Sequence, residues 1–304
     1  MKVSLYTITL NGGYYDGPAV PLLEIFPKAA EWGYDGVEIE AKRPHGSPLD
    51  LDAAARRRIR KAAADSGVAV SCIASYNDFS SPIDEHRENE LLMVREQIAL
   101  AADLEAPIVR VFSAWSGVTR RDGRITYDVA RHQLEDRWPG TTALEKWRHV
   151  RDCLAEAARM AEAAGVTLAL QNHKPIINHY QDMLDFIAEV NSPALKACLD
   201  APLMSDHSEA HYRAAIEATG ELFVHTHFGG RYVADADGKV DVLGKRHADY
   251  PTFMRLAKAA GFAGHTGYEL CSPVLTGHRH EGLDYALQQA ALACRYMRGI
   301  IDSL

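Results

Sequence analysis

Residues 166–173 read VTLALQNH, an apolar run that ends in three polar side chains. Similar short apolar or β-branched runs occur at seven other places: VSLYTITL (3–10), GVEIEA (36–41), AVSCIAS (69–75), IVRVFSA (108–114), LKACLDA (195–201), LFVHTHF (222–228) and HTGYELC (265–271). Between them lie longer amphipathic stretches, for example PLLEIFPKAAEWG (21–33) and EKWRHVRDCLAEAARMAEAAG (145–165). Several such stretches end at a glycine, which suits the left-handed residue that closes a helix: Gly33, Gly67, Gly165, Gly220 and Gly261.

This alternation of strands and helices predicts a parallel sheet whose crossover connections are the helices. Eight such units in 304 residues match a closed (β/α)8 TIM barrel of the α/β class, and we expect residues 1–304 to form a single domain. A doubly wound open sheet is the alternative, but the GxGxxG turn after the first strand is missing. Three strand-to-helix connections are long, and in a barrel such connections form the catalytic face: roughly residues 115–143, 229–248 and 272–282.

The composition is that of a globular chain with a full core, since 47% of the residues are hydrophobic and 24% are charged. The formal net charge of −8 would repel a phosphate backbone, so we expect no nucleic-acid partner. No apolar run approaches the ~18 residues that span a membrane, and the N-terminus lacks the unbroken apolar region of a signal peptide. Five cysteines without a CxxC pair favour buried free thiols. We therefore expect a cytoplasmic protein without a membrane partner.

Residue types that bind metals collect at the carboxyl ends of the last four strands: Gln171, His173, Asp200, His225, His227 and Glu269. A lone aspartate at such a place usually caps a helix, and a lone histidine in a strand is usually a satisfied core residue. Four successive strands that end this way are a different case, because a barrel points their ends at one axis. A buried, unpaired carboxylate or imidazole is costly, and a divalent cation offsets that cost. A mixed oxygen and imidazole set suits Mn²⁺, Mg²⁺, Co²⁺ or Zn²⁺.

The segments VTLALQNH, LKACLD, VHTHFGGR and GYEL, in this order, resemble those of the xylose-isomerase-like TIM barrels, the superfamily of sugar phosphate isomerases and epimerases. The resemblance covers essentially the whole chain and implies one bound divalent metal ion, with Mn²⁺ favoured. It implies four ligands: Gln171, Asp200, His227 and Glu269. His225 would then lie behind the ligands or face the substrate.

The chain departs from the pattern of this family in two places. Gln171 stands where the family usually has glutamate, so the metal site has one negative charge fewer. The stretch HKPIIN (173–178) lacks the further glutamate that the epimerases use, which argues against a mechanism with two symmetrical carboxylates. His173 lies two residues after Gln171, so strand alternation places both side chains on one face. An ordinary histidine pKa near 6.5 suits a general base, and we expect His173 and Glu269 to be the catalytic residues.

Four side chains are predicted to contact the substrate: Glu38, Lys174, His225 and Arg231. Glu38 alternates inward on the second strand, as Glu40 does, and Tyr6 does the same on the first strand. Arg231 resembles a substrate-binding arginine of the family. A solvated surface position is the alternative for both Lys174 and Arg231.

Such a site supports removal of a proton α to a carbonyl, with the metal carrying the charge of the enediolate. We expect an enzyme that acts on a keto-sugar or other small carbohydrate and leads to isomerisation or elimination. The alternatives are a sugar 3-epimerase and an inosose-type dehydratase. The segments LQNH and LDAP also resemble the α subunits of C-glycoside deglycosidases, which cleave 3-keto-glycosides by enolisation. That resemblance implies a small β subunit as partner, and a homo-oligomer is the alternative.

Two hypotheses come from other functional classes. Endonuclease IV-like DNA repair proteins share the barrel, but they need ligands for three metals and a basic groove, which the net charge of −8 disfavours. The second hypothesis is a metal-free carbohydrate-binding barrel, which would keep the pocket but would not catalyse a reaction. Metal analysis of the purified protein separates that case from an enzyme.

Overall fold

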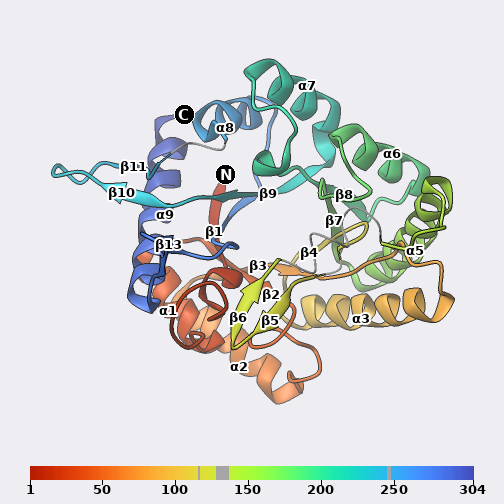
Figure 1. The fold of residues 1–304 in the computed structure, drawn as a ribbon, viewed down its shortest axis with the longest axis horizontal. Coiled ribbons are helices and arrows are strands. Elements are labelled where there is room, and N and C mark those ends of the chain that lie inside the picture. The colour runs from red at the N-terminus through yellow and green to blue at the C-terminus, as the bar shows by residue number, and fades with distance from the viewer. Residues whose placement is uncertain (116, 128–136, 245–247) are drawn as a thin grey trace.

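The computed structural model describes residues 1–115, 117–127, 137–244 and 248–304. Within these residues, eight parallel strands close into a barrel in the order β1-β12-β9-β8-β7-β4-β3-β2 (Figure 1). The predicted (β/α)8 TIM barrel is therefore confirmed, and the open doubly wound sheet is excluded. The barrel strands are β1 Lys2–Tyr6, β2 Gly36–Glu40, β3 Ala69–Ala74, β4 Ile108–Val111, β7 Thr167–Gln171, β8 Leu195–Cys198, β9 Phe223–Gly229 and β12 His265–Glu269.

The helices form a ring outside the barrel (Figure 1). They are α1 Leu22–Trp32, α2 Ala53–Ser66, α3 Asp84–Asp103, α5 Ala143–Ala164, α6 Tyr180–Val190, α7 Glu209–Thr219, α8 Tyr250–Ala259 and α9 Leu283–Ser303. Helix α5 shows why such stretches become helices. Thr142 and Glu145 form a capping box at its start, and Gly165 ends it with a left-handed φ of 69°. The face between them buries an apolar stripe that includes Val150 and Leu154.

The first strand is shorter than its apolar pattern predicts. β1 ends at Tyr6, and residues Thr7–Leu10 form a 3-10 turn, η1. The threonine hydroxyls of this turn cap the neighbouring strands, because Thr7 Oγ1 accepts a hydrogen bond from Glu40 N (2.9 Å) and Thr9 Oγ1 accepts one from Leu270 N (3.1 Å). The run therefore leaves the sheet after Tyr6 and remains tied to the ends of β2 and β12 through these two hydroxyls.

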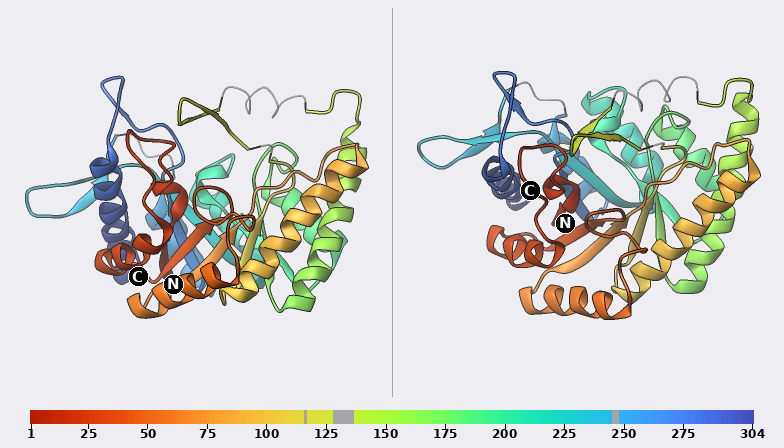
Figure 2. Two further views of the ribbon diagram at one scale, coloured as in Figure 1. Left: turned by 90° about the horizontal axis from the view of Figure 1, so that it is seen from below. Right: turned by 60° about the horizontal axis from the view of Figure 1, so that its bottom comes forward.

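Each of the three long connections contains a small hairpin where we expected irregular loop. The hairpins are β5 Thr119–Arg121 with β6 Arg124–Thr126, β10 Tyr232–Ala234 with β11 Val240–Val242, and β13 Leu275–Thr276 with β14 Arg279–His280. The β5–β6 and β13–β14 hairpins lie at the end of the barrel opposite the labelled N-terminus (Figure 2). That end receives the carboxyl ends of the barrel strands, so it is the face on which a site is expected.

Free cysteines, as predicted, are found at all five positions: Cys72, Cys153, Cys198 and Cys294 are buried, and Cys271 is partly exposed. Cys72 and Cys198 pack with Ile108 and Ala169 in a small apolar cluster that is separate from the main core. In the part of the chain that the structure describes, no helix has both the length and the apolar character needed to cross a membrane.

Candidate active site

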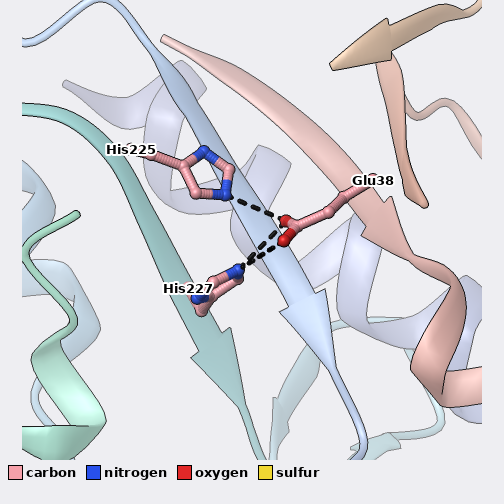
Figure 3. Close-up of side chains that lie close together, drawn as sticks. All are labelled: Glu38, His225 and His227. Atoms are coloured by element: carbon pink, nitrogen blue, oxygen red, sulfur yellow. Dashed lines mark hydrogen bonds and ion pairs between the residues drawn. The ribbon is translucent and has the colours of Figure 1, made fainter. Parts of the chain in front are cut away.

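Glu38 of β2 directs its carboxylate at two histidines of β9 (Figure 3). His225 Nε2 lies 2.9 Å from Glu38 Oε2, and His227 Nε2 lies 3.0 Å from the same oxygen. These three side chains are at most 1% exposed. Gly267 of β12 makes room for them, because a Cβ there would lie 2.9 Å from Glu38 Oε2 and 2.8 Å from His227 Cδ2. A side chain at this position would push the pair apart.

His227 also faces Asp200, which lies two residues after β8 and precedes the 3-10 turn η2 (Ala201–Leu203). Asp200 Oδ1 accepts a hydrogen bond from His227 N at 2.6 Å, and Oδ2 lies 3.1 Å from His227 Nδ1. Gln171, the last residue of β7, donates its Nε2 to the same Oδ2. Asn172 holds the Asp200 backbone, since its Oδ1 accepts from Asp200 N at 2.7 Å. The structure therefore brings Gln171, Asp200 and His227 together, as the sequence predicted.

The donor types and their spacing fit a divalent cation. Two ligand atoms that each lie about 2.1 Å from an octahedral cation are about 3 Å apart, which is close to the 3.1 Å between Asp200 Oδ2 and His227 Nδ1. Gln171 Oε1 is buried and has no hydrogen-bond partner among the described residues, so its lone pairs are free for a cation. The other nitrogen of His227 faces Glu38, and a carboxylate in that place commonly orients a metal-binding histidine.

The carboxylates and histidines of this cluster shift one another's pKa values. Burial alone would raise the pKa of Glu38, but His227 and His225 hold it well below its usual value. Burial would lower the pKa of His227, yet Glu38 and Asp200 raise it well above the ordinary histidine value. Without a cation, His227 is thus an imidazolium between two carboxylates. A cation on its Nδ1 would replace one of those protons.

Glu269, the fourth predicted ligand, lies at the end of β12 and is less tightly placed. The described residues form two metal-ligand triplets, and Glu269 belongs to neither: Glu38 with His225 and His227, and Cys198 with Asp200 and His227. It lines a cavity of about 110 Å³ together with Gln171 and His173. Burial, reinforced by the charge of Asp200 and opposed by His227, raises the pKa of Glu269 to about 7.

His173 projects into the same cavity from the segment after β7. Its ring packs edge-on against Trp115 and Phe112, with centroids 4.6 and 4.9 Å away. This apolar setting lowers the pKa of His173 to about 4, so the ring is neutral at pH 7. Nδ1 lies 2.5 Å from the Lys174 carbonyl oxygen. A carbonyl only accepts, so Nδ1 carries the proton and Nε2 keeps a free lone pair.

The four predicted substrate-binding residues take three different positions. Glu38 and His225 have no exposed surface and bind each other beside His227, and their role as substrate contacts stays a prediction. Lys174 is exposed and offers its carbonyl to His173. Arg231 lines a second, larger cavity and donates from Nη1 to the Leu275 carbonyl oxygen at 2.8 Å.

Two further polar side chains of the cavity wall, Arg110 and Tyr76, were not predicted from the sequence, whereas their neighbour Tyr6 was expected to point inward. Arg110 of β4 lines the smaller cavity, donates to Tyr6 Oη at 3.0 Å, and has no hydrogen-bond partner for its Nε in the described chain. Tyr6 Oη lies 2.9 Å from Tyr76 Oη, and Tyr76 donates to Glu40 at 2.9 Å. The available signal was a cation inside the apolar run IVRVFSA, the same signal that identified the acidic ligands.

A family model described as xylose isomerase-like TIM barrel matches residues 26–293. The chain belongs to this family. It is 25% identical over 283 residues to fructoselysine 3-epimerase of Shigella flexneri, covering 88% of this chain and 91% of that protein. The D-psicose 3-epimerase of Clostridium cellulolyticum H10, solved with D-tagatose, superposes with a TM-score of 0.73 at 18% identity over 99% of both chains. The 3-keto-D-glucoside 4-epimerase of E. coli gives 0.69 at 19% identity, over 97% of this chain and 99% of that one.

These findings confirm the predicted family and fold. The relatives are named as sugar epimerases, which agrees with the prediction of an enzyme of the sugar isomerase and epimerase type. The roles of individual residues, the metal ion and the cytoplasmic location stay predictions.

Proposed function

We propose that this protein is a divalent-cation-dependent enzyme that removes the proton next to the carbonyl of a keto-sugar or related sugar derivative. The resulting enediolate then isomerises or eliminates a substituent, as in the deglycosylation of a 3-keto-C-glycoside. One observation carries this proposal. The buried group Gln171, Asp200 and His227, whose amide oxygen has no hydrogen-bond partner in the described part of the chain, lies beside a cavity that contains a neutral histidine with a lone pair on Nε2.

Asp200, His227 and Gln171 would hold the cation, and Glu269, which faces the adjoining cavity, would be the fourth ligand. Bound there, a cation such as Mn²⁺ would polarise the substrate carbonyl and stabilise the negative charge that forms on its oxygen. Glu38 keeps His227 in the orientation that presents Nδ1 to this place.

His173 is the proposed base. Its Nε2 is free to accept a proton because Nδ1–H is held by the Lys174 carbonyl. Trp115 and Phe112 pack edge-on against the ring and hold it in place. Arg110 lies in the wall of the same cavity as a permanent positive charge, which favours the imidazole over the imidazolium and favours a negative substrate oxygen.

A second function, a sugar 3-epimerase or an inosose-type dehydratase, is favoured by a different observation. Glu269 and His173 line one cavity, and the raised pKa of Glu269, about 7, allows it to donate a proton while His173 accepts one. Two unlike groups around one substrate carbon permit a proton to leave on one face and return on the other. The epimerase names of the relatives support this alternative.

The test is a screen of keto-sugars and 3-keto-glycosides with added Mn²⁺, read by deuterium incorporation from D₂O and by product analysis. We expect exchange at the carbon next to the carbonyl in the parent, and its loss in Asp200→Asn. Product analysis separates an isomer, an epimer and an eliminated aglycone. Stoichiometric metal together with no exchange on any substrate contradicts the proposal, and a protein that binds sugars but no metal would be a carbohydrate-binding barrel.

A further inference from the structure

A second cavity, of about 670 Å³, adjoins the candidate site. It lies between η2, the segment after β9, the end of β11 and residues 270–275. Leu203, Glu269 and Cys271 belong to the walls of both cavities. A molecule whose reacting carbon lies at Glu269 can therefore extend from the small cavity into the large one.

The two cavities differ in volume and can therefore hold different parts of one molecule. The smaller cavity, about 110 Å³, has the volume of roughly four water molecules at about 30 Å³ each. The larger one falls within the range of about 300–1,000 Å³ that binds compact organic ligands. A free sugar with its reacting carbon in the small cavity leaves most of the larger cavity to solvent.

The walls of the large cavity that the structure describes are mainly apolar. Leu203, Leu243 and Leu275 line it although each is exposed by more than a third (37%, 41% and 39%). Val242 and Val274 extend the same surface. Exposed apolar side chains that gather on one concavity, in place of being scattered singly, indicate a surface that is covered by a ligand.

We propose that this cavity binds a large apolar substituent of the substrate, such as an aryl aglycone, while the reacting carbon of the sugar to which it is attached lies in the smaller cavity. The substrate class is then a keto-glycoside with a bulky apolar aglycone, and a free keto-sugar is a poor substrate. Arg231, at the Leu275 carbonyl, supplies one cation at this wall for a polar oxygen of the aglycone. This inference rests on the proposed function for the sugar half of the site.

Binding tests the inference without requiring turnover. Calorimetry with Mn²⁺ present compares 4-methylumbelliferyl β-D-glucoside with methyl β-D-glucoside, a pair that differs in the aglycone alone. We expect the aryl glycoside to bind at least about tenfold more tightly, which corresponds to ~1.4 kcal/mol. The ratio of affinities should fall toward one in Leu243→Asp and in Leu275→Asp, whose exposed positions tolerate a carboxylate. Leu144→Asp is the matched control, because Leu144 is 57% exposed on α5 and lines neither cavity.

Equal affinity of the two glycosides in the parent protein overturns the inference, as does a ratio that Leu243→Asp and Leu275→Asp leave unchanged. Sedimentation of the same variants adds a further check. If the substitutions dissociate a dimer without changing the ratio, the apolar wall is an interface between copies of the chain, which also overturns it. The proposed function fails separately, when the aryl glycoside binds with the expected ratio but no keto-glycoside exchanges deuterium.

Discussion

Replacing Glu38 by glutamine removes one charge from the centre of the barrel and changes almost no volume. The carboxylate accepts from His225 at 2.9 Å and from His227 at 3.0 and 3.1 Å, and Arg110 Nε lies 3.9 Å away. Because the group is fully buried, breaking this pairing should destabilise the metal-free protein by about 3–5 kcal/mol. Loss of the carboxylate that orients His227 should also weaken metal binding by roughly 10–100-fold.

The stability difference between the parent and Glu38→Gln should also depend on pH. The pKa of Glu38 is lowered in the folded protein, so its contribution is present above its unfolded pKa of about 4.3 and is lost as pH falls. The pKa of His227 is raised, so its contribution is complete below about 6.5 and is lost as pH rises through the folded value. The stability difference between parent and Glu38→Gln should therefore be largest between about pH 4.3 and 6.5.

Urea unfolding of the metal-free proteins across this range, with Mn²⁺ titrations of both, measures the two effects. Glu209→Gln is the matched control, because Glu209 forms exposed ion pairs with Arg213 (2.9 Å) and Arg255 (3.0 Å). Its loss should change the stability little at any pH, because water and salt screen exposed ion pairs. If Glu38→Gln is as mild as the control and binds Mn²⁺ like the parent, the assigned role of Glu38 is refuted.

Three further predictions concern the cavity. His173→Ala should keep its metal and lose about 10²–10⁴ in turnover. Burial lowers the pKa of His173 to about 4, so the pH–rate profile of the parent should show no acidic limb from this residue near pH 6.5. A fall in the metal content of the variant would instead make His173 a ligand. Gln171→Glu should bind Mn²⁺ more tightly in titrations and turn over more slowly, since a better neutralised cation polarises a carbonyl less; a faster variant contradicts this account. Asp200→Asn should lose more bound metal than Glu269→Gln, because Asp200 contacts His227 and Gln171 whereas Glu269 lies outside both ligand triplets. If elemental analysis shows the reverse order, the cation lies nearer Glu269.

The arrangement of helices and strands could be predicted because it depends on local patterns. Apolar runs of strand length, amphipathic stretches and closing glycines each act within about 20 residues, and the barrel follows from eight repeats. The first strand shows where local patterns stop being sufficient. VSLYTITL has the apolar and β-branched residues of a strand, yet it leaves the sheet after Tyr6, and the hydroxyls of Thr7 and Thr9 then accept hydrogen bonds from the backbone at the neighbouring strand ends.

Parts of the candidate site could also be predicted from the sequence, and other parts could not. Gln171, Asp200 and His227 could be found because each follows or ends an apolar strand, and a closed barrel brings strand ends to one axis. Glu38 is predicted to contact the substrate because alternation shows that its side chain points inward, but alternation does not show how deep it lies. Its burial behind His227 is a matter of barrel stagger and of the space above Gly267.

The sequence by itself determined the class of fold, the polar residues at the strand ends and the family pattern, because these features depend on the order of residues along the chain. Only the tertiary structure decided the states of the side chains. The lowered pKa of His173 comes from burial in a cavity wall that it shares with Trp115, about 60 residues earlier in the sequence, and the raised pKa of Glu269 comes from burial beside Asp200. Electrostatic free energies depend on distances through space and on the exclusion of water, and neither quantity exists until the barrel closes.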